Sequence, residues 1–324
     1  FHLKPDVARS CFPCAARRSP SSLSSKSEAA PLDSPPDSRP STPCLRTIAI
    51  VAGECRKTSI LMARSLFNWP NTLVLLLVHG RDCWIAMREE AKILTRESHR
   101  FKVEQLDLDD PGEAEECASM AMARYPSIKS LVLDAKAMPE PRDREDGSNH
   151  PVGRAMRGAL VAFNALRPYF AGNMRVMVVS SHMGIQAQWL TSKPWQAELF
   201  RNAALDLARL DGIVEQFAED HAAAVKRMAL LPSRAPSGLW LDINGFGFVL
   251  LHALLCVWHR QHTRLNICAC CCLRERSDLD SEEVGTVVRV MSDDSLEFAS
   301  VSQQLFGNHA QRMPWFSDDR LLDY

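Results

Sequence analysis

The stretch RTIAIVAGECRKTSILMARSL, residues 46–66, decides the fold. Thr47 to Val51 form a short apolar run with β-branched residues, and Gly53 follows it closely. A polar turn comes next, and apolar residues then recur at helical spacing at Ile60, Leu61, Ala63 and Leu66. This order of strand, turn and helix predicts the opening of a βαβ unit of the kind that binds dinucleotides.

The turn of such a unit normally carries three glycines, which let a pyrophosphate lie against the N-terminus of the helix. Here Gly53 keeps the first place, whereas Lys57 and Ser59 stand where the next two glycines are expected. Larger side chains hinder a close approach of the backbone to pyrophosphate. Lys57 still offers a positive charge to a phosphate, so weak nucleotide binding stays open. The fold signal is therefore intact, while the signal for cofactor chemistry is damaged.

The composition is that of an ordinary globular protein. The chain has 324 residues, of which 46% are hydrophobic and 24% are charged, and its formal net charge is -1. This charge gives no reason to expect nucleic acid or an anionic membrane as a partner. The length allows one sizeable α/β domain and a tail.

The first 44 residues are rich in Ser, Pro and Arg, and we expect residues 1–44 to be disordered. They are interpreted as a targeting region or as a solvated linker. Because the chain begins with Phe1, we interpret it as a fragment, a processed form or an incomplete gene model. We expect a domain at residues 45–318 with an insert at about 184–240, then a tail at 319–324. The expected location is the cytoplasm, with an organelle as the alternative.

Strands and helices are expected to alternate along the chain. Strands are expected at residues 47–51, 72–78, 101–108, 130–133, 174–179 and 264–271, and helices at 60–66, 84–95, 113–125, 152–166, 195–210, 212–230, 245–258 and 282–291. This alternation predicts an α/β fold, with a Rossmann-like doubly wound parallel sheet and helices on both faces. The apolar run at 245–258 is too short to span a bilayer, so we expect a buried helix and no membrane span.

The chain has eleven cysteines, four of them close together at Cys268, Cys270, Cys271 and Cys272. With the pair Cys11 and Cys14 they offer ligands for zinc, but no second well-spaced pair supports such a site. We therefore expect reduced cysteines in a tail and in a buried strand, and no metal site.

Several segments, taken in order, resemble the short-chain dehydrogenase/reductases, and the carbonyl reductase branch in particular. They are IVAGECRKTS (50–59), HGRD (79–82), QLDLDD (105–110), LVLDAKA (131–137), RVMVVSSHMG (175–184), NGFGFVLL (244–251), NICACCCLRERSDL (266–279) and EEVGT (282–286). Each segment departs from the family pattern, and the ordered series carries the resemblance.

The resemblance implies an NADPH-dependent reduction of carbonyl compounds. In this family a tyrosine donates a proton, a nearby lysine makes that phenol more acidic, and a serine binds the carbonyl oxygen. Here the serine matches Ser181, but Phe246 stands at the tyrosine position and Leu250 at the lysine position. The family's supporting asparagine falls at His150 or Asn149.

The cofactor-side matches that remain are Gly53, Lys57, Arg81 and Asp107, with Arg81 placed to meet a ribose phosphate. In the segment LVLDAKA, the asparagines of the family pattern are replaced by Leu133 and Asp134, and the glycine by Lys136. NADPH is therefore the implied cofactor, but the changed residues argue against tight binding.

Other single residues have ordinary structural explanations. A serine at the end of a strand, such as Ser181, is usually a turn residue. His182 follows it directly, and neighbouring side chains on a strand point to opposite faces. His252 lies on the apolar helix, and we expect it to be a hydrogen-bonded core histidine.

Three hypotheses about function stay open. The first is a catalytically impaired reductase homologue, a pseudoenzyme that acts as a structural or regulatory protein, with a partner surface on residues 239–258. The second is an active but divergent carbonyl oxidoreductase that uses Ser181 with a water molecule or His150 on a small carbonyl substrate. The third is a decayed gene or faulty exon joining, whose product folds poorly.

Overall fold

The computed structural model describes residues 46–53, 56–95, 99–125, 127–138, 151–190, 193–230, 243–271, 279–292, 305–306 and 312–313. All of them belong to one compact unit, Pro43–Tyr324. The expected segments 1–44 and 319–324, and the candidates His150 and Asn149, lie outside the described residues.

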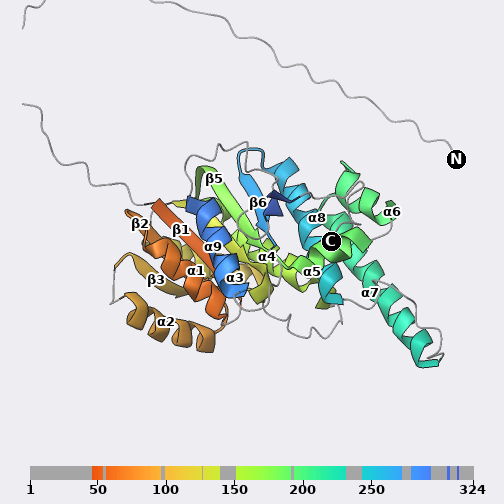
Figure 1. Cartoon of the computed structure of the whole chain (residues 1–324), viewed down its shortest axis with the longest axis horizontal. Coiled ribbons are helices and arrows are strands. Elements are labelled where there is room, and N and C mark those ends of the chain that lie inside the picture. Colours follow the sequence, from red (N-terminus) through yellow and green to blue (C-terminus); the bar gives the residue numbers. More distant parts are fainter. Residues whose placement is uncertain are drawn as a thin grey trace, which may run out of the picture. The chain divides into compact units, whose positions relative to one another are not determined.

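One sheet runs through the middle of this unit (Figure 1). Its strands are β1 (Arg46–Ala52), β2 (Thr72–Val78), β3 (Phe101–Gln105), β4 (Ile128–Asp134), β5 (Phe170–Val179), β6 (Asn266–Cys270), β7 (Leu305–Phe306) and β8 (Arg312–Met313). Their order is β3-β2-β1-β4-β5-β6-β7-β8, and all pairs are parallel except β7 with β8. The predicted Rossmann-like doubly wound sheet is confirmed.

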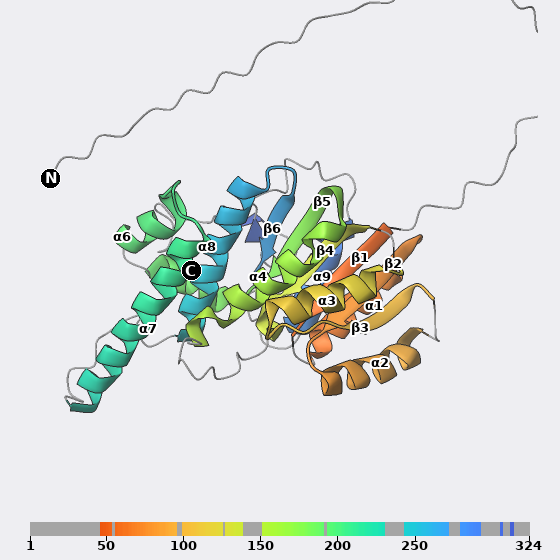
Figure 2. The same ribbon diagram turned by 180° about the vertical axis from the view of Figure 1, so that it is seen from behind.

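Helices cover both faces of the sheet. They are α1 (Lys57–Phe67), α2 (Arg81–Thr95), α3 (Pro111–Met122), α4 (Arg154–Leu166), α5 (His182–Leu190), α6 (Lys193–Gln196), α7 (Leu207–Leu230), α8 (Ile243–Gln261) and α9 (Leu279–Ser292), with short helical turns η1 (Ala135–Ala137), η2 (Pro151–Gly153), η3 (Arg167–Tyr169) and η4 (Ala197–Arg201). Helices α1, α2 and α9 pack on one face, and α3, α4 and α8 on the other (Figures 1 and 2).

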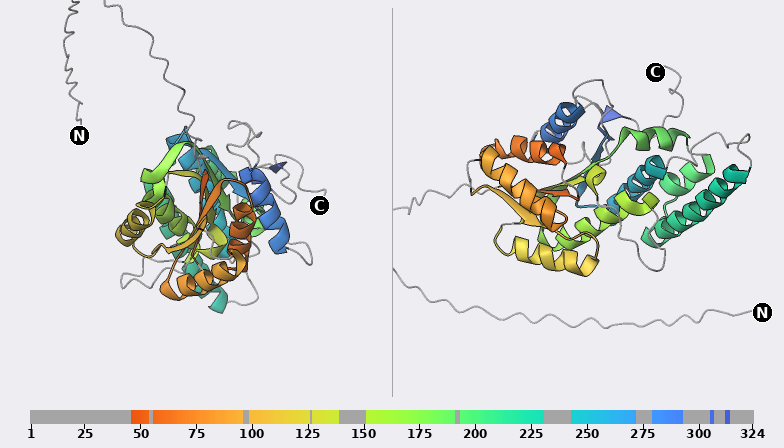
Figure 3. Two further views of the ribbon diagram at one scale, coloured as in Figure 1. Left: turned by 90° about the vertical axis from the view of Figure 1, so that its left-hand side faces the viewer. Right: turned by 90° about the horizontal axis from the view of Figure 1, so that it is seen from below.

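Strand β1 shows why the sequence forms this arrangement. Ile48 and Ile50 face the core under α1 and α9, while Ala49 and Val51 face the core under α4 and α8. A strand buried on both faces has apolar side chains at every position, because both sets leave water. This explains the continuous apolar run of β2 as well, whose predicted bounds agree with the structure. Figure 3 shows the helical layers on the two sides of the sheet.

The prediction of one helix at residues 195–210 is wrong, because the helical chain stops at Asn202. Asn202 has an extended backbone (ψ 107°), and its side-chain oxygen accepts a hydrogen bond from the N–H of Ala204 at 2.9 Å. Asp206 then accepts a hydrogen bond from the N–H of Arg209 at 2.8 Å, as an N-cap residue does. Helix α7 therefore begins at Leu207 and continues through Gly212, where a second helix was expected to start.

Helix α8 lies inside the unit, so the expected partner surface on residues 239–258 is wrong for its described part. Leu250 is 0% exposed and Trp258 is 1% exposed. The Trp258 ring stacks on Phe163 of α4, with 4.1 Å between the ring centroids. Neighbouring helices thus cover this apolar face within the unit. Within the described residues, no helix is both long enough and apolar enough to cross a membrane.

The cysteines of β6 lie in the core. Cys268 and Cys270 face the helices α1 and α9, and both carry thiols rather than disulfides. Burial raises the pKa of the Cys268 thiol to about 12. These residues agree with the expected reduced cysteines in a buried strand. Cys83 of α2, about which the sequence makes no prediction, is disulfide-bonded. Cys272 lies outside the described residues.

Candidate functional site

The candidate site lies at the carboxyl ends of β1 and β4, in the middle of the sheet. The chain passes from β1 through β2 to β3 and then crosses to β4 on the other side of β1. In open α/β sheets, ligands bind outside the carboxyl ends of the strands where the order reverses in this way. Gly53 follows β1 and is buried, and Lys57 opens α1 and is exposed.

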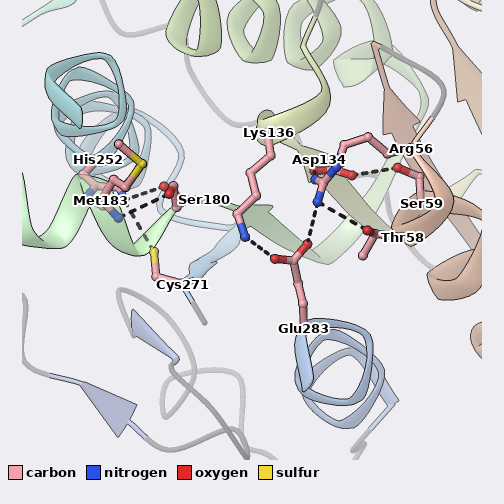
Figure 4. Close-up of polar contacts among 11 residues, drawn as sticks. Arg56, Thr58, Ser59, Asp134, Lys136, Ser180, Met183, His252, Cys271 and Glu283 are labelled. Carbon is pink, nitrogen blue, oxygen red and sulfur yellow. Dashed lines mark hydrogen bonds and ion pairs between the residues drawn. The ribbon is translucent and has the colours of Figure 1, made fainter. Parts of the chain in front are cut away.

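Arg56, Ser59 and Asp134 form a polar network at this place (Figure 4). Asp134 ends β4 and is fully buried. Its Oδ1 accepts a hydrogen bond from Nη1 of Arg56 at 2.8 Å, and its Oδ2 accepts one from the Ser59 hydroxyl at 2.7 Å. Nη2 of Arg56 also donates to Oγ1 of Thr58 at 3.3 Å. The network therefore joins the start of α1 to the end of β4 and uses both oxygens of Asp134.

A second ion pair, between Lys136 and Glu283, borders this network. Glu283 comes from α9, and its Oε2 accepts a hydrogen bond from Nζ of Lys136. Its Oε1 lies 3.6 Å from Nη2 of Arg56. Burial raises the pKa of the Glu283 carboxyl, and this outweighs the opposing effect of the nearby cations. Burial acts to lower the pKa of Lys136, but the charge and hydrogen bond of Glu283 together outweigh it, and the net shift is upward.

These residues do not fit the pyrophosphate of NADPH. In such a turn a pyrophosphate lies close to the backbone N–H groups at the start of the helix, and a free cation nearby strengthens its binding. Here Arg56 is paired with Asp134 and Lys136 with Glu283, so these four side chains have a net formal charge of zero, and exposed Lys57 adds one positive charge at the start of the helix. Ser59 adds a buried side chain where a glycine is expected.

The other two cofactor-side candidates lie beside the ends of β2 and β3. Arg81 is exposed at the start of α2, and Asp107 follows β3. Oδ1 of Asp107 accepts a hydrogen bond from the N–H of Asp109 at 2.9 Å. The structure thus separates the candidates into two groups, one at the end of β1 and one at the ends of β2 and β3.

His79, Asp107 and Asp109 have the spacing of a metal site within the described residues, which the sequence did not suggest. However, Nδ1 of His79 accepts a hydrogen bond from the N–H of Leu108 at 3.1 Å. The ring proton of the neutral histidine therefore sits on Nε2, which faces Oδ2 of Asp109 at 3.6 Å. A metal-bound histidine instead donates from its second nitrogen, so this group is better explained as a local hydrogen-bonded turn.

The two positions that resemble the family's tyrosine and lysine are part of the hydrophobic core. Phe246 is 3% exposed and stacks on Phe217 of α7, with 4.0 Å between ring centroids and 9° between ring planes. Leu250 lies one turn further along α8 and is 0% exposed. Neither side chain carries an ionisable group, so neither supplies a proton or lowers a pKa.

Ser181 and its neighbour Ser180 have different environments at the end of β5. Ser181 is partly exposed, and its hydroxyl accepts a hydrogen bond from the N–H of Met183 at 3.2 Å, a turn role that the sequence predicts. Ser180 is buried, and its hydroxyl lies 2.8 Å from Nε2 of His252 (Figure 4). The structure therefore pairs the buried serine, rather than Ser181, with a histidine.

His252 is the hydrogen-bonded core histidine that the sequence predicts. Its Nδ1 donates to Oε1 of Gln188 at 3.1 Å, since the amide oxygen is only an acceptor. Nε2 then accepts from the Ser180 hydroxyl, and the Cys271 thiol lies 3.6 Å from the same atom. Burial lowers the pKa of His252 to about 3. The ring is thus neutral near pH 7 and acts as a structural crosslink between α5, α8 and β5.

Sequence reasoning missed the network of Arg56, Asp134, Lys136 and Glu283. Asp134 and Lys136 were noted only as departures from the family pattern. A charged residue that directly follows a buried strand is a signal for a polar contact at that edge. The partner Glu283 is 147 residues from Lys136 in the chain, so no local pattern reveals it.

No protein-family model matches the chain, and no curated protein matches it. Solved structures do match. Menthone neomenthol reductase from Mentha piperita has a TM-score of 0.61 and 15% identity, over 81% of this chain and 98% of that one. A short-chain dehydrogenase/reductase from Serratia marcescens has a TM-score of 0.50 and 12% identity, over 82% and 98%.

A carbonyl reductase from Pseudomonas aeruginosa PAO1, solved in complex with NADP, has a TM-score of 0.51 and 13% identity, over 84% of this chain and 100% of that one. Identities this low establish the architecture and leave the chemistry to the residues of the site. The chain therefore has the fold of the short-chain dehydrogenase/reductases, with carbonyl reductases among its structural neighbours.

Proposed function

We propose that this chain is a carbonyl reductase-like protein that has lost reductase activity and acts as a structural or regulatory binding protein. The observation that supports this proposal most strongly is the stacking of Phe246 on Phe217 in the core, with Leu250 fully buried one turn away. A reductase of this fold class needs a proton donor and a cation at these two places. With buried apolar residues at both positions, the chain has no proton donor there, and the space is occupied by core side chains.

The network at the carboxyl ends of β1 and β4 supports the same proposal from the cofactor side. Its cations are paired with carboxylates of the same chain, and Ser59 and Asp134 are buried. A pyrophosphate would have to break these pairs before it could bind, at a cost that a preformed site does not have.

The experiment is a turnover assay on the intact purified chain. Oxidation of NADPH and of NADH is followed with ketones, aldehydes and quinones, against a buffer blank and an active carbonyl reductase as positive control. We expect no rate above the blank. Turnover of any carbonyl compound that Ser181→Ala abolishes would reject the proposal.

The second candidate is an active, divergent NADPH-dependent carbonyl oxidoreductase. The partial exposure of Ser181 at the carboxyl end of β5 favours it, because the hydroxyl is open to a small carbonyl substrate. In that case a water molecule or His150 would replace the tyrosine as proton source. Loss of turnover in Ser181→Ala, with an unchanged unfolding midpoint, would establish this candidate.

A further inference from the structure

The side chain of Glu283 lies at the carboxyl ends of the central strands, although Glu283 is far from these strands in the sequence. Helix α9 packs beside α1, and the Glu283 side chain extends from it toward the ends of β1 and β4 (Figure 4). There it lies beside two cationic side chains from different segments of the chain. Arg56 precedes α1, and Lys136 follows β4, and both lie at the place where the strand order reverses.

Both cations lie beside the same carboxylate. Nζ of Lys136 donates to Oε2 of Glu283, while Nη2 of Arg56 is 3.6 Å from Oε1. The side chain of Lys136 is 15% exposed and that of Arg56 is 24% exposed, so both charges are largely shielded from water. A carboxylate and a phosphate both present acceptor oxygens to such donors, and phosphate forms the same charge-assisted hydrogen bonds.

Stabilisation alone explains the position of Glu283 poorly. Its side chain is 1% exposed, and among the described residues its buried Oε1 accepts no hydrogen bond. Burying a carboxylate oxygen without a hydrogen bond costs free energy, and buried ion pairs are seldom better than apolar packing. Thr58 is the only other described partner that Arg56 Nη2 reaches, at 3.3 Å.

We propose that Glu283 is an internal ligand, whose carboxylate fills an anion site formed by Arg56 and Lys136 and keeps phosphate-bearing molecules out of it. The ligand class that the emptied site takes is a small molecule with a pyrophosphate or phosphoryl group. With Glu283 replaced, one of the two cationic charges has no carboxylate partner, and the local charge becomes positive.

The test is a gain of binding. Glu283→Ala removes both the charge and the volume of the side chain, and Glu283→Gln removes only the charge. Inorganic pyrophosphate is titrated into the full chain at pH 7.5 by calorimetry and by shift of the unfolding midpoint. We expect Glu283→Ala to bind pyrophosphate at least about tenfold more tightly than the parent, and Glu283→Gln to gain less.

Two further proteins decide whether the gain arises at this site. The double variant Glu283→Ala with Lys136→Met should lose the gain, since the unpaired cation is gone. Glu89→Ala removes a carboxylate of an exposed ion pair with Lys92 and should leave pyrophosphate binding unchanged.

The proposal is overturned if the parent binds pyrophosphate as tightly as Glu283→Ala, or if the double variant keeps the gain. It is also overturned if both Glu283 variants unfold cooperatively and neither gains binding. If Glu283→Ala fails to fold, Glu283→Gln, which keeps the size and one acceptor oxygen, decides the outcome. These readouts do not depend on turnover, so failure here is distinct from failure of the proposed function.

Discussion

Phe246 of α8 lies face to face with Phe217 of α7, with 4.0 Å between the ring centroids and 9° between the ring planes. The residue that resembles the family's proton donor is thus a packing residue between two helices. Leu250, one turn along α8, is equally buried. These two residues make apolar contacts in the core, and Phe246 helps to hold α7 and α8 together.

Restoring the family residues should therefore damage the fold rather than create an enzyme. Leu250→Lys places a charge at a position with 0% exposure. We expect a loss of about 3–5 kcal/mol in the free energy of unfolding, because the charge has no buried partner. Urea unfolding measures this loss. Leu250→Met, which keeps the apolar volume, should cost less than about 1.5 kcal/mol. A stable double variant Phe246→Tyr, Leu250→Lys that reduces carbonyl compounds would contradict this reading.

Asp134 should be the most important member of the network for stability. It is fully buried and accepts hydrogen bonds from Arg56 and from Ser59. Asp134→Ala should lower the free energy of unfolding by about 3 kcal/mol, the low end for a broken buried pair, because water partly screens Arg56. Ser59→Ala removes one hydrogen bond and should cost about 1–3 kcal/mol. Denaturant unfolding measures the loss of unfolding free energy in each variant. A larger loss in Ser59→Ala than in Asp134→Ala would count against this ranking.

His252 should make stability depend on pH below neutrality. Its folded-state pKa is about 3, while its unfolded value is near 6.5, so between these values the unfolded state binds more protons. The stabilisation is complete above pH 6.5 and falls as the pH falls toward 3. From pH 6.5 to pH 5 the parent should lose about 2 kcal/mol through this residue.

The control for this pH effect is the same measurement on His252→Gln, whose side chain does not titrate. Its free energy of unfolding should change less over this interval, by the amount assigned to His252. His99→Gln, at an exposed histidine, should follow the parent curve closely. Parallel curves for the parent and His252→Gln would show that His252 is not held neutral in the core.

Gly184 should tolerate no side chain, because α5 and α8 touch there. A Cβ at this position would lie 2.4 Å from Cβ of Phe248. Gly184→Ala should therefore cost about 1–3 kcal/mol through displacement of the two helices. The matched control is Gly212→Ala in α7, where a Cβ meets nothing within 4 Å. It should stabilise by about 0.5–1 kcal/mol, because alanine loses less backbone entropy in a helix. Thermal unfolding should show a lower unfolding midpoint for Gly184→Ala and a higher one for Gly212→Ala than for the parent.

The order of the elements could be predicted because each buried strand has its own continuous apolar run. The bounds of β2, Thr72–Val78, follow directly from the residues TLVLLLV. The break before α7 was missed because Asn202 and Asp206 look like ordinary polar residues within a helical pattern. Their capping bonds to Ala204 and Arg209 become visible only in the structure.

The site could be predicted only in part. The places of Phe246 and Leu250 follow from an ordered series of local segments, and the replacement of two expected turn glycines is read directly from Lys57 and Ser59. The contact between Lys136 and Glu283 depends on the packing of α9 against the sheet, which no local sequence pattern predicts. The choice between Ser180 and Ser181 depends on which way each side chain points at the end of β5.

If the fold is kept without its dinucleotide cofactor, NADPH should not bind. Titration of NADPH into the intact purified chain by calorimetry tests it most directly. We expect no heat of binding up to about 1 mM NADPH. This corresponds to a free energy of binding weaker than about −4 kcal/mol. Saturable one-site binding with a Kd below about 100 μM, roughly −5.5 kcal/mol, would contradict the claim. It would show that the network around Asp134 and Glu283 does not keep NADPH out.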